Sequence, residues 1–536
     1  MAEKAQKGIV LSAGLVASVG LTTSFVVMMV KRFKRWQRNS ETSRLAEAVV
    51  NQPFSVGEWA KMSRSRSVDM DPTQINTPQK PVAHPTMGGI TGTPDTIALV
   101  MVGLPGRGKT AIAARTCRYL RFFHGLECQH FNVGDRRRAG AGYFMHSEYT
   151  FDEKAIKQRK VYSDKTLQEL KLFLLTPGRI AIFDSSNVTS ERRLEVYSEI
   201  KKLGKVDVIF VEVMSDETNV SEEEMAEGDV AGAAAIDSIQ DYGMRVANYQ
   251  KVYEPIASGN EDEDDHEHNF SYIKCINGGK QIIMNKIDGY MPGRIAQFIT
   301  NCCHCHWTSE KRLYLSRHGQ SEYNATGRIG GDSDLTEMGE RYALALRDLA
   351  ETRIRTHPRD ASLVVPARLW TSTLKRTRNT ARHITTPTIM TSTGHPWVQM
   401  KPRVWSNLDE IYAGACDGMT YEEIKERFPK EAALRKKDKL SYRYPRGESY
   451  LDVIQRLEPL VQEIERHREP LLIVGHQGVL RMIYAFYAGI DREDAPHQEL
   501  KLNHVTVLTP HAYGCGVEVM NLLEKETPTD DGQKHH

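Results

Sequence analysis

The feature that most constrains the fold is a repeated pairing of a short apolar run, which ends in polar residues, with a helix-forming stretch. From Thr96 to Thr110 the chain reads TIALVMVGLPGRGKT, and the helix-forming stretch AIAARTCRYLRFF follows it. The runs CQHFNVG, RIAIFDSSN and VDVIFVEVM repeat the pattern, with a helical segment near Leu167–Leu175 before the second of them. Short apolar strands that alternate with helices predict a parallel sheet covered on both faces.

A second series of the same kind begins at Lys311. Its apolar runs are RLYLSRHG, RLWTSTLKRT and PLLIVGHQG, and each one leads into charged or hydroxyl-bearing residues. A chain of 536 residues is too long for one ordinary core. The sequence therefore predicts the α/β class with two tandem domains, over residues 96–305 and 306–524, and a disordered tail over 525–536. In such sheets ligands bind at the carboxyl ends of the strands, where these polar groups fall.

The N-terminal residues 1–38 have a different texture. The segment Gly8–Val30 carries no charge, and a basic run begins at Lys31. A helix of about 20 apolar residues crosses a hydrocarbon core, so we expect a transmembrane anchor, with the following domains in the cytosol by the positive-inside rule. A cleaved secretory signal is the alternative, but the stretch is long for one and lacks a clear cleavage site. Residues 39–95 are polar and rich in proline, serine and threonine, which predicts a flexible linker.

The composition gives little reason to expect a nucleic-acid partner, because the net charge is only +2. The eight cysteines are sparse, although Cys302, Cys303 and Cys305 cluster beside two histidines. A zinc site would need a second pair of ligands at a distance, so free thiols in a reducing compartment are the favoured interpretation. The acidic stretch Gly259–Asn269 predicts an exposed loop.

The stretch GLPGRGKT satisfies the pattern G-x-x-x-x-G-K-[ST] and stands between a predicted strand and a predicted helix. Its glycines let backbone N–H groups close around phosphate oxygens, its lysine neutralises phosphate charge and its threonine offers a hydroxyl to Mg²⁺. The predicted nucleotide-binding residues are Gly103, Gly106, Gly108, Lys109 and Thr110. Asp184, at the end of RIAIFD, is expected to meet the metal together with Thr110 and to act in catalysis.

A second phosphate site is predicted in the C-terminal half. Arg317 and His318 end one strand, His476 ends another, and Arg376 and Glu410 follow further apolar runs. A phosphate needs several cations, one nucleophile and one proton donor, and these residue types supply all three. His318 would attack phosphorus, the arginines and His476 would balance its oxygens, and Glu410 would protonate the leaving alcohol and then activate water. Asn324 and Arg328 lie in the loop after the first strand.

These motifs also resemble those of a known family. The stretches SRHGQSEYN, GRIGGDSDLT, LDEIYAGACDGMTYEEI, YRYPRGESY and GHQGVLR resemble the histidine phosphatases, and more narrowly the bisphosphatase half of the 6-phosphofructo-2-kinase/fructose-2,6-bisphosphatase family. The upstream stretches GLPGRGKT, FNVGDRRR and FDSSNVTSERR resemble the kinase half, in the same order. The resemblance covers roughly residues 96–519. It implies ATP and Mg²⁺ for the kinase half, no cofactor for the phosphatase half, and fructose 6-phosphate and fructose 2,6-bisphosphate as substrates; we also expect a homodimer.

The resemblance implies roles for further residues at matching positions of this chain. In the phosphatase half, His318 would be the phosphohistidine and Glu410 the acid and base, while Arg317, Arg376 and His476 would bind the 2-phosphate. Its other implied substrate contacts are Asn324, Tyr421, Arg435, Lys439, Tyr450, Gln477 and Arg481. In the kinase half, the implied fructose 6-phosphate contacts are Arg137, Arg138, Arg245 and Tyr249.

One stretch departs from the family pattern and keeps two alternatives open. The family usually carries N-I-x-x-x-K-x-x-S-P-D-Y, whereas residues Asn219–Tyr242 are acidic here and contain no lysine. Position 136 is arginine where the family has tyrosine, and Lys157 or Arg159 could supply a further cation of the kinase site. The first hypothesis is a bifunctional enzyme. The second is a bisphosphatase whose P-loop domain senses nucleotide, and the third is a membrane-anchored scaffold that binds phosphorylated ligands without turnover.

Overall fold

The computed structural model describes residues 96–136, 153–215, 246–256, 266–303, 311–357, 360–511 and 514–523. The predicted span Gly8–Val30, the linker 39–95 and the tail 525–536 lie outside these ranges. Within the described ranges, no helix is both long enough and apolar enough to cross a membrane.

The first sheet has six strands in the order β2-β3-β1-β4-β5-β6. Five of them run parallel, and β6 is antiparallel to β5 at one edge. The strands are β1 (Ile97–Val102), β2 (Cys128–Asn132), β3 (Ile180–Asp184), β4 (Asp207–Met214), β5 (Ser271–Ile276) and β6 (Gln281–Asn285). The apolar runs of the sequence therefore form a parallel sheet, and β1 and β3 pair in register with Val100 opposite Phe183.

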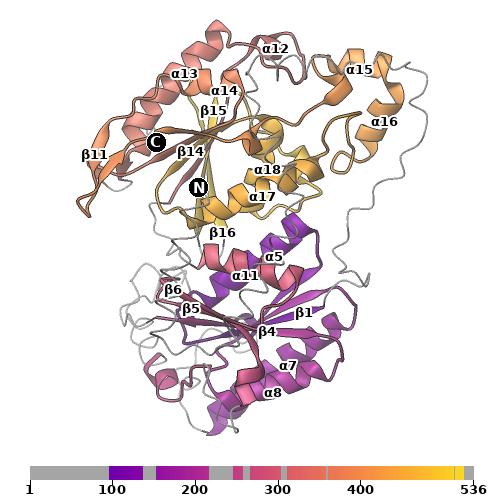
Figure 1. The fold of residues 1–536 in the computed structure, drawn as a ribbon, viewed down its shortest axis with the longest axis vertical. Helices are drawn as coiled ribbons and strands as arrows, with labels where there is room; N and C mark the ends of the chain where they lie inside the picture. The colour runs from indigo at the N-terminus through magenta and orange to yellow at the C-terminus, as the bar shows by residue number, and fades with distance from the viewer. Residues whose placement is uncertain are drawn as a thin grey trace, which may run out of the picture. The chain divides into compact units, whose positions relative to one another are not determined.

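Helices cover both faces of this sheet, as Figure 1 shows. They are α5 (Lys109–His124), α7 (Glu153–Leu174), α8 (Ser190–Lys201) and α11 (Tyr290–Cys302). Successive side chains of β1 point to opposite faces: Leu99 packs in the same cluster as Ile112 of α5, whereas Val100 packs in the cluster with Leu170 of α7. A continuous apolar run such as IALVMV is the expected sequence of a strand buried on both faces.

The second sheet also has six strands, in the order β13-β10-β14-β7-β15-β16. Strands β13, β10, β14 and β7 are parallel, whereas β15 and β16 continue the sheet in antiparallel fashion. The strands are β7 (Leu313–Arg317), β10 (Arg368–Thr371), β13 (Pro402–Val404), β14 (Leu471–Gly475), β15 (His504–His511) and β16 (Gly514–Asn521). The carboxyl ends of β7, β10 and β14 lie side by side, because Gly475 pairs with Arg317 and Thr371 with Val474.

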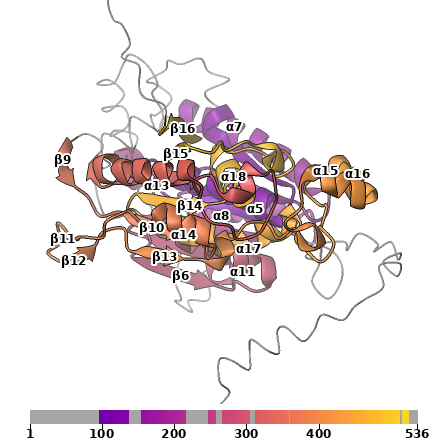
Figure 2. The ribbon, with the colours of Figure 1, turned by 90° about the horizontal axis from the view of Figure 1, so that it is seen from above.

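The helices of this half include four that carry or flank the predicted phosphate site. They are α14 (Lys375–Ala381), α15 (Tyr421–Arg427), α17 (Tyr450–Arg466) and α18 (Gln477–Ala488). Helix α15 packs against α16 (Pro429–Lys437). Helix α13 (Glu337–Leu349) and two small hairpins, β8–β9 (Thr356–His357 and Asp360–Val364) and β11–β12 (Thr388–Met390 and Pro396–Val398), lie between β7 and β13. In Figures 1 and 2, the β11–β12 hairpin and the α15–α16 pair lie at opposite ends of this half.

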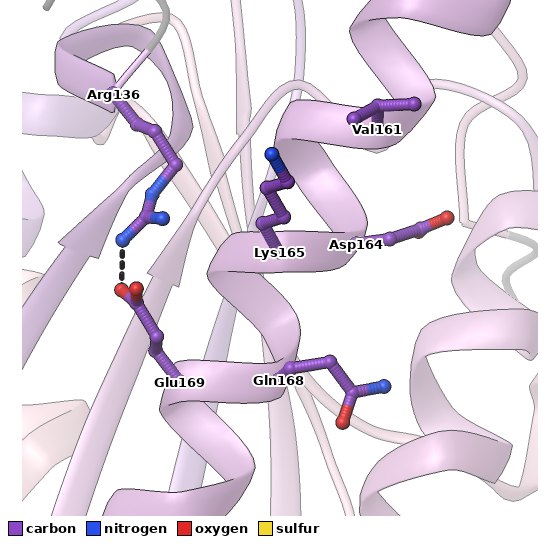
Figure 3. Close-up of a pocket in the computed structure, with 6 residues that line it drawn as sticks. All are labelled: Arg136, Val161, Asp164, Lys165, Gln168 and Glu169. Atoms are coloured by element: carbon purple, nitrogen blue, oxygen red, sulfur yellow. Dashed lines mark hydrogen bonds and ion pairs between the residues drawn. The ribbon is translucent and has the colours of Figure 1, made fainter. Parts of the chain in front are cut away.

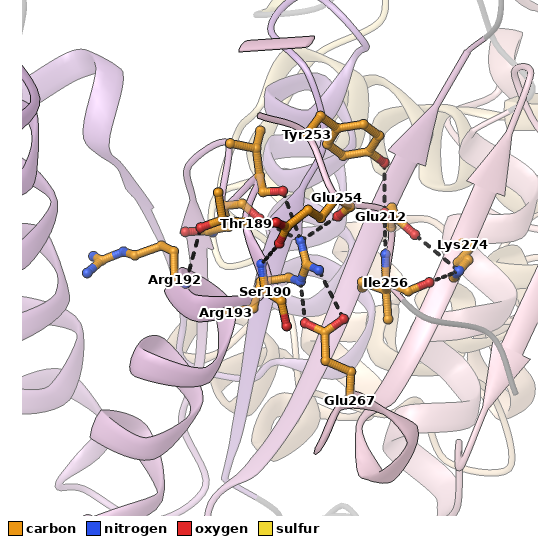
Figure 4. A network of polar contacts seen from close by, with 12 residues as sticks. Thr189, Ser190, Arg192, Arg193, Glu212, Tyr253, Glu254, Ile256, Glu267 and Lys274 are labelled. Carbon is orange, nitrogen blue, oxygen red and sulfur yellow. Dashed lines mark hydrogen bonds and ion pairs between the residues drawn. The ribbon is translucent and has the colours of Figure 1, made fainter. Parts of the chain in front are cut away.

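The prediction of an exposed loop over Gly259–Asn269 is wrong at its C-terminal end. Residues His266–Asn269 form a turn of 3-10 helix in which Glu267 is only 2% exposed. Its carboxylate pairs with Arg193 of α8, which is fully buried, at 2.7 Å and 2.9 Å. Figure 4 shows this pair inside a wider polar network. A buried carboxylate is stable here because a guanidinium neutralises it.

Candidate active sites

The loop after β1 has the geometry that a phosphate-binding loop requires. Gly103 adopts φ +132°, and a Cβ there would stand 2.4 Å from the carbonyl oxygen of Val213. Gly108 is in the left-handed region and caps α5, whose first turn contains Lys109 and Thr110. The N–H groups of a helix N-terminus attract anions. Lys109 is only 7% exposed, and its Nζ donates to the carbonyl oxygen of Leu104 at 2.6 Å, inside the loop itself.

Asp184 ends β3, the strand beside β1, so its carboxylate lies at the sheet edge from which the loop also emerges. It is 4% exposed. His130 Nε2 and Asn132 Nδ2, both from β2, each lie 3.0 Å from Asp184 Oδ2. Hydrogen bonding and the charge of Asp184 raise the pKa of His130, although burial opposes that shift. The buried acid is thus held by its neighbours.

A magnesium nucleotide fits these residues. The glycine loop and the start of α5 offer N–H groups to phosphates, and Lys109 adds a buried positive charge. Thr110 and Asp184 are oxygen ligands of the kind that Mg²⁺ prefers, and the bound metal would offset negative charge on the phosphates. Among the described residues, the donors from His130 and Asn132 both contact Oδ2 of Asp184 rather than Oδ1.

The acceptor side of this site is described only in part. Arg137, Arg138, Arg245 and the acidic stretch Asn219–Tyr242 lie outside the described residues, whereas Tyr249 is half-buried on a helical segment. Lys157 is exposed and Arg159 half-buried on α7. Arg136 forms an ion pair with Glu169 of α7. Figure 3 shows this pair at a pocket of about 520 Å³, whose lining residues are Arg136, Val161, Asp164, Lys165, Gln168 and Glu169.

In the second sheet, adjacent strand ends bring the two predicted histidines together. His318 follows β7 and His476 follows β14; they are 3% and 0% exposed, and their ring centroids are 5.1 Å apart. Arg376, in the first turn of α14, lies between them. Its Nε is 3.2 Å from His318 Nε2 and 3.2 Å from His476 Nδ1. The guanidinium is also fixed by the carbonyl oxygen of Gly331, which accepts from NH1 at 2.5 Å.

The hydrogen bonds of His318 define which ring nitrogen can react. Its Nδ1 lies 2.7 Å from its neighbour's carbonyl oxygen, that of Gly319, which can only accept. Nδ1 therefore carries the proton, and the lone pair of Nε2 faces Arg376. Burial, followed by the charge of Arg376, lowers the pKa of His318 well below its usual range. Burial and Arg376 also lower the pKa of His476. Both rings are consequently neutral in the empty site at neutral pH.

Glu410 and Arg317 border the same site. Both carboxylate oxygens of Glu410 accept from the N–H of Gly478, at 3.0 Å and 3.3 Å, in the first turn of α18. Burial lowers the pKa of Arg317 to about 10, and the negative charge of Glu410 partly offsets this effect. Burial also lowers the pKa of Arg376, and the negative charge of Glu410 again partly offsets this effect. The carboxylate is therefore within electrostatic reach of both arginines, and Arg317 NH1 donates to the carbonyl oxygen of Leu500 at 3.0 Å.

A second group of cations lies within electrostatic reach of Arg317, whose pKa the charge of Arg481 helps to lower. Lys439 Nζ and Arg481 NH1 both donate to the carbonyl oxygen of Pro496, at 2.7 Å and 2.5 Å. Arg481 NH1 also donates to Tyr450 Oη at 3.1 Å. Arg435 lies over the ring of Tyr421, 5.2 Å from its centroid. Burial, together with the charges of Arg481 and Arg435, lowers the pKa of Lys439 to about 8. These side chains thus form one positively charged surface.

The remaining predicted residues of this half differ in how they contribute. Asn324 Oδ1 accepts from the N–H and hydroxyl of Ser321 and so closes the N-terminal turn of α12 (Glu322–Ala325). Gln477 is half-buried at the first position of α18, directly after His476. Arg328 NH1 donates to the carbonyl oxygen of Gly418 at 2.6 Å and lies 3.4 Å from Glu423 of α15. Arg328 therefore connects the loop that follows α12 to Gly418 and to α15.

Several residues that hold the site were missed in the sequence. Ser372 Oγ lies 2.7 Å from His476 Nε2 and 2.8 Å from the hydroxyl of Thr377. Thr380 Oγ1 accepts from the N–H of Gly319 at 2.8 Å, and so fixes the peptide that orients His318. The motif TSTLKRTRNT contains all three hydroxyls. Hydroxyls at a strand end, before a helix that carries an arginine, were the signal that could have identified them.

The cysteine cluster gives no metal site within the described ranges, where no group of three or more candidate ligands comes together. Cys302 and Cys303 are both buried. Cys305 and the histidines beside it lie outside the described residues.

Comparison with known proteins agrees with both sites. Residues 87–306 match the 6-phosphofructo-2-kinase family, and residues 313–523 match branch 1 of the histidine phosphatase superfamily. A 6-phosphofructo-2-kinase/fructose-2,6-bisphosphatase from Arabidopsis thaliana is 40% identical over 76% of this chain and 52% of its own length. Relatives with that name from Rattus norvegicus (form 3) and Caenorhabditis elegans are 35% and 36% identical, over 82% and 83% of this chain and 74% and 93% of their own lengths.

The chain thus spans about half of the plant relative and most of the animal ones. It contains a kinase domain followed by a phosphatase domain, and it belongs to the 6-phosphofructo-2-kinase/fructose-2,6-bisphosphatase family.

Proposed function

We propose that this chain is a bifunctional enzyme that sets the level of fructose 2,6-bisphosphate. The kinase domain transfers the γ-phosphoryl group of ATP to the 2-hydroxyl of fructose 6-phosphate. The phosphatase domain removes that phosphate and regenerates fructose 6-phosphate. The relatives that share both domains carry both activities in their names, and the residues of the two sites support the same pair of reactions here.

The observation that carries the phosphatase assignment is the position of Arg376 Nε between the two histidines. A phosphoryl group that replaces this contact would meet the lone pair of His318 Nε2, with Arg376 and His476 at its oxygens. His318 attacks phosphorus, and the bond to the sugar's 2-oxygen breaks as Glu410, which must enter this step as the carboxylic acid, protonates that oxygen. Glu410, now a carboxylate, takes a proton from water, which attacks the phosphohistidine and releases inorganic phosphate. Arg317 and Arg376 balance the charge on the phosphoryl oxygens in both steps.

The second group of cations supports a bisphosphorylated sugar as the substrate. Lys439, Arg435 and Arg481 repel one another in the empty site, which is one reason why the pKa of Lys439 is lowered. A dianionic phosphate relieves that repulsion. A substrate with two phosphates would therefore occupy both positive surfaces, with the 2-phosphate at His318 and the 6-phosphate at Lys439 and Arg481.

In the kinase domain the chemistry is positioning and charge stabilisation without a covalent intermediate. The glycine loop and Lys109 hold the phosphates of ATP, and Thr110 and Asp184 would hold Mg²⁺. Arg137, Arg138 and Arg245 remain predicted contacts of fructose 6-phosphate. The buried hydrogen bonds of Asp184 to His130 and Asn132 preset its carboxylate before substrates arrive.

Two assays on the purified full-length chain test this proposal. ATP and fructose 6-phosphate should yield fructose 2,6-bisphosphate, and fructose 2,6-bisphosphate alone should yield inorganic phosphate. Hydrolysis without any synthesis would favour the second candidate, a bisphosphatase with a nucleotide-sensing P-loop domain. The acidic, lysine-free stretch Asn219–Tyr242 is the observation in favour of that candidate, because carboxylates near transferring phosphoryl groups oppose charge stabilisation. The absence of both reactions would leave the scaffold hypothesis.

We further propose that Gly8–Val30 anchors the chain in a membrane with both catalytic domains on the cytosolic side. The support is the uncharged length of this segment and the basic run after it. Fractionation after alkaline extraction tests the anchor: the chain should stay with the membrane pellet, and release into the supernatant would contradict it. A homodimer remains a prediction, which sedimentation equilibrium of the purified chain would test.

A further inference from the structure

A chain of buried hydroxyls stands behind His476, on the side away from His318. Ser372 follows β10 directly and His476 follows β14, the neighbouring strand, so the two residues meet at the same edge of the sheet. Both are 0% exposed. Ser372 Oγ lies 2.7 Å from His476 Nε2 and 2.8 Å from Thr377 Oγ1. Water does not reach either group, so their hydrogen bonds must be satisfied within the protein.

The direction of each hydrogen bond in the series Thr377–Ser372–His476 follows from the groups at the two ends of that series. Thr377 Oγ1 lies 2.8 Å from the carbonyl oxygen of Leu374 and 3.3 Å from that of Ser372, and both can only accept, so the proton of Thr377 points to these carbonyls. Thr377 therefore accepts from the hydroxyl of Ser372. With its proton committed, Ser372 Oγ accepts from the N–H of Leu374, at 3.2 Å, and from His476 Nε2. The hydrogen bonds of the two hydroxyls therefore require that His476 carries its proton on Nε2.

The opposite nitrogen of the same ring gives an independent result. His476 Nδ1 lies 3.2 Å from Arg376 Nε, and a guanidinium N–H can only donate. Nδ1 must therefore hold the lone pair in the empty site. The two ends agree on one neutral tautomer, with the proton on Nε2 toward Ser372 and the lone pair on Nδ1 toward Arg376 and the phosphate position.

We propose that Ser372 is a positioning residue of the phosphatase, which holds the Nε2 proton of His476 so that the ring gains and loses a second proton only at Nδ1, the nitrogen that faces the phosphate position. A lone pair at Nδ1 would repel a phosphoryl oxygen. Protonation of Nδ1 turns it into a donor to that oxygen, while Nε2 keeps the same bond to Ser372 in both states. A phosphate group that binds as its monoanion supplies this proton and becomes the dianion, and it takes the proton back when it leaves.

The electrostatic surroundings of His476 fit this role. In the empty site burial and Arg376 lower its pKa, and His318, Arg317 and Arg456 act in the same direction. The neutral ring is therefore the resting form, and a phosphate dianion beside Nδ1 would favour the charged form. Without Ser372 the Nε2 proton would be buried without an acceptor. The tautomer with its proton on Nδ1 would then become similar in free energy to the Nε2–H tautomer. The inference rests on the proposed phosphatase function, because it assigns the protonation state in which His476 binds the phosphoryl oxygens.

The test compares three single variants of the full-length chain, with a matched control among them. Ser372→Ala removes the acceptor. Thr377→Val removes the group that receives the serine proton, so the serine can donate to Nε2 instead. Thr371→Val is the control, because Thr371 is adjacent and 1% exposed, and its hydroxyl has no hydrogen-bond partner within the described part of the chain.

The first readout is the ¹⁵N NMR signature of His476 in protein with labelled histidine, which needs no turnover. The wild type and Thr371→Val should show a protonated Nε2 and an unprotonated Nδ1, and inorganic phosphate should protonate Nδ1. Ser372→Ala and Thr377→Val should both populate the Nδ1–H tautomer in the empty site. A single Nε2–H tautomer in all four proteins would overturn the proposal, whether or not the chain hydrolyses fructose 2,6-bisphosphate.

The second readout is the kinetics of hydrolysis. At metal sites, loss of the partner that orients a ligating histidine typically costs about tenfold to a hundredfold in activity, and we expect a similar factor for a partner of His476. Ser372→Ala should therefore lower kcat by about that factor, with a smaller change in KM and a displaced acid limb of the pH profile. Thr377→Val should give a smaller loss, and Thr371→Val none. Unchanged kcat and pH profile in Ser372→Ala would contradict the inference, whereas inactivity of the wild type would contradict the proposed function instead.

Discussion

The two sheets present their polar groups at the same kind of position, the carboxyl ends of parallel strands, but they prepare them differently. In the phosphatase half, His318, His476 and Arg376 are buried and in mutual contact before any ligand arrives. In the kinase half, Lys109 contacts a carbonyl oxygen of its own loop, and the carboxylate of Asp184 contacts His130 of the neighbouring strand. Covalent catalysis needs one ring nitrogen fixed in one direction, whereas phosphoryl transfer to a bound acceptor relies on charge placed around the phosphates.

The largest effect should come from the nucleophile of the phosphatase half. His318→Ala removes the only step that makes the phosphoenzyme, so hydrolysis of fructose 2,6-bisphosphate should fall by about a thousandfold or more. Synthesis from ATP and fructose 6-phosphate should persist and become easier to measure, because product is no longer removed. Steady-state assays of both reactions on the same preparation check this. Normal hydrolysis by the variant would contradict the assignment of His318 as the nucleophile.

The matching change in the kinase half is Lys109→Met. It removes a buried positive charge from the phosphate loop while it keeps the length of the side chain. Loss of one such stabilising group lowers kcat by about a hundredfold to a thousandfold. Synthesis of fructose 2,6-bisphosphate should fall by that factor, and hydrolysis should stay at the wild-type rate. Equal loss of both activities would mean that the two sites do not act separately.

A third prediction compares a buried ion pair of the kinase half with an exposed pair of the phosphatase half. Glu267→Gln leaves Arg193 buried without its full counter-charge, since the two side chains are 3% and 0% exposed. Removing one partner of a buried pair costs about 3 kcal/mol or more in the free energy of unfolding. Glu518→Gln, at a pair with Arg353 whose side chains are 52% and 38% exposed, should cost less than about 1 kcal/mol. Urea unfolding measures both, and equal costs would contradict the role given to burial.

The smallest effect concerns the pH dependence of substrate binding in the phosphatase half. The pKa of Lys439 is lowered to about 8, so its ammonium loses its proton as the pH rises through 8. Attraction for the 6-phosphate should weaken over that range, and KM for fructose 2,6-bisphosphate should rise. Lys439→Met should raise KM about tenfold at pH 7, an order of magnitude expected for one charged contact, and abolish the rise above pH 8. A KM that increases equally in both proteins would assign the titration to another group.

The sequence was sufficient to predict much of this structure. The runs TIALVMV, RIAIFD, RLYLSR and PLLIVG all form strands, and the polar residues that follow them lie at the predicted edge of each sheet. Adjacent strand ends explain why His318 and His476, far apart in the chain, could be predicted as partners. Strand periodicity and helix caps are local properties, so they can be read from one sequence.

Other features depend on distances that no local pattern determines. Arg376 donates to the carbonyl of Gly331, and Lys439 and Arg481 share the carbonyl of Pro496. Backbone acceptors carry no sequence signature. Glu267 was predicted in an exposed loop because its neighbours are acidic, but Arg193 lies against it in the fold and makes burial favourable. The hydroxyl chain behind His476 was missed for the same reason, since serine and threonine are common wherever a strand meets a helix.

The central claim is that the Nε2 atom of His318 carries the phosphoryl group during turnover. The most direct test is rapid acid-free quenching of the full-length chain with fructose 2,6-bisphosphate labelled in its 2-phosphate, followed by peptide mapping and NMR of the modified ring. The account predicts an acid-labile label on Nε2 of His318 that decays as inorganic phosphate appears. A label on Nδ1, a label on another residue, or turnover with no labelled protein would contradict it.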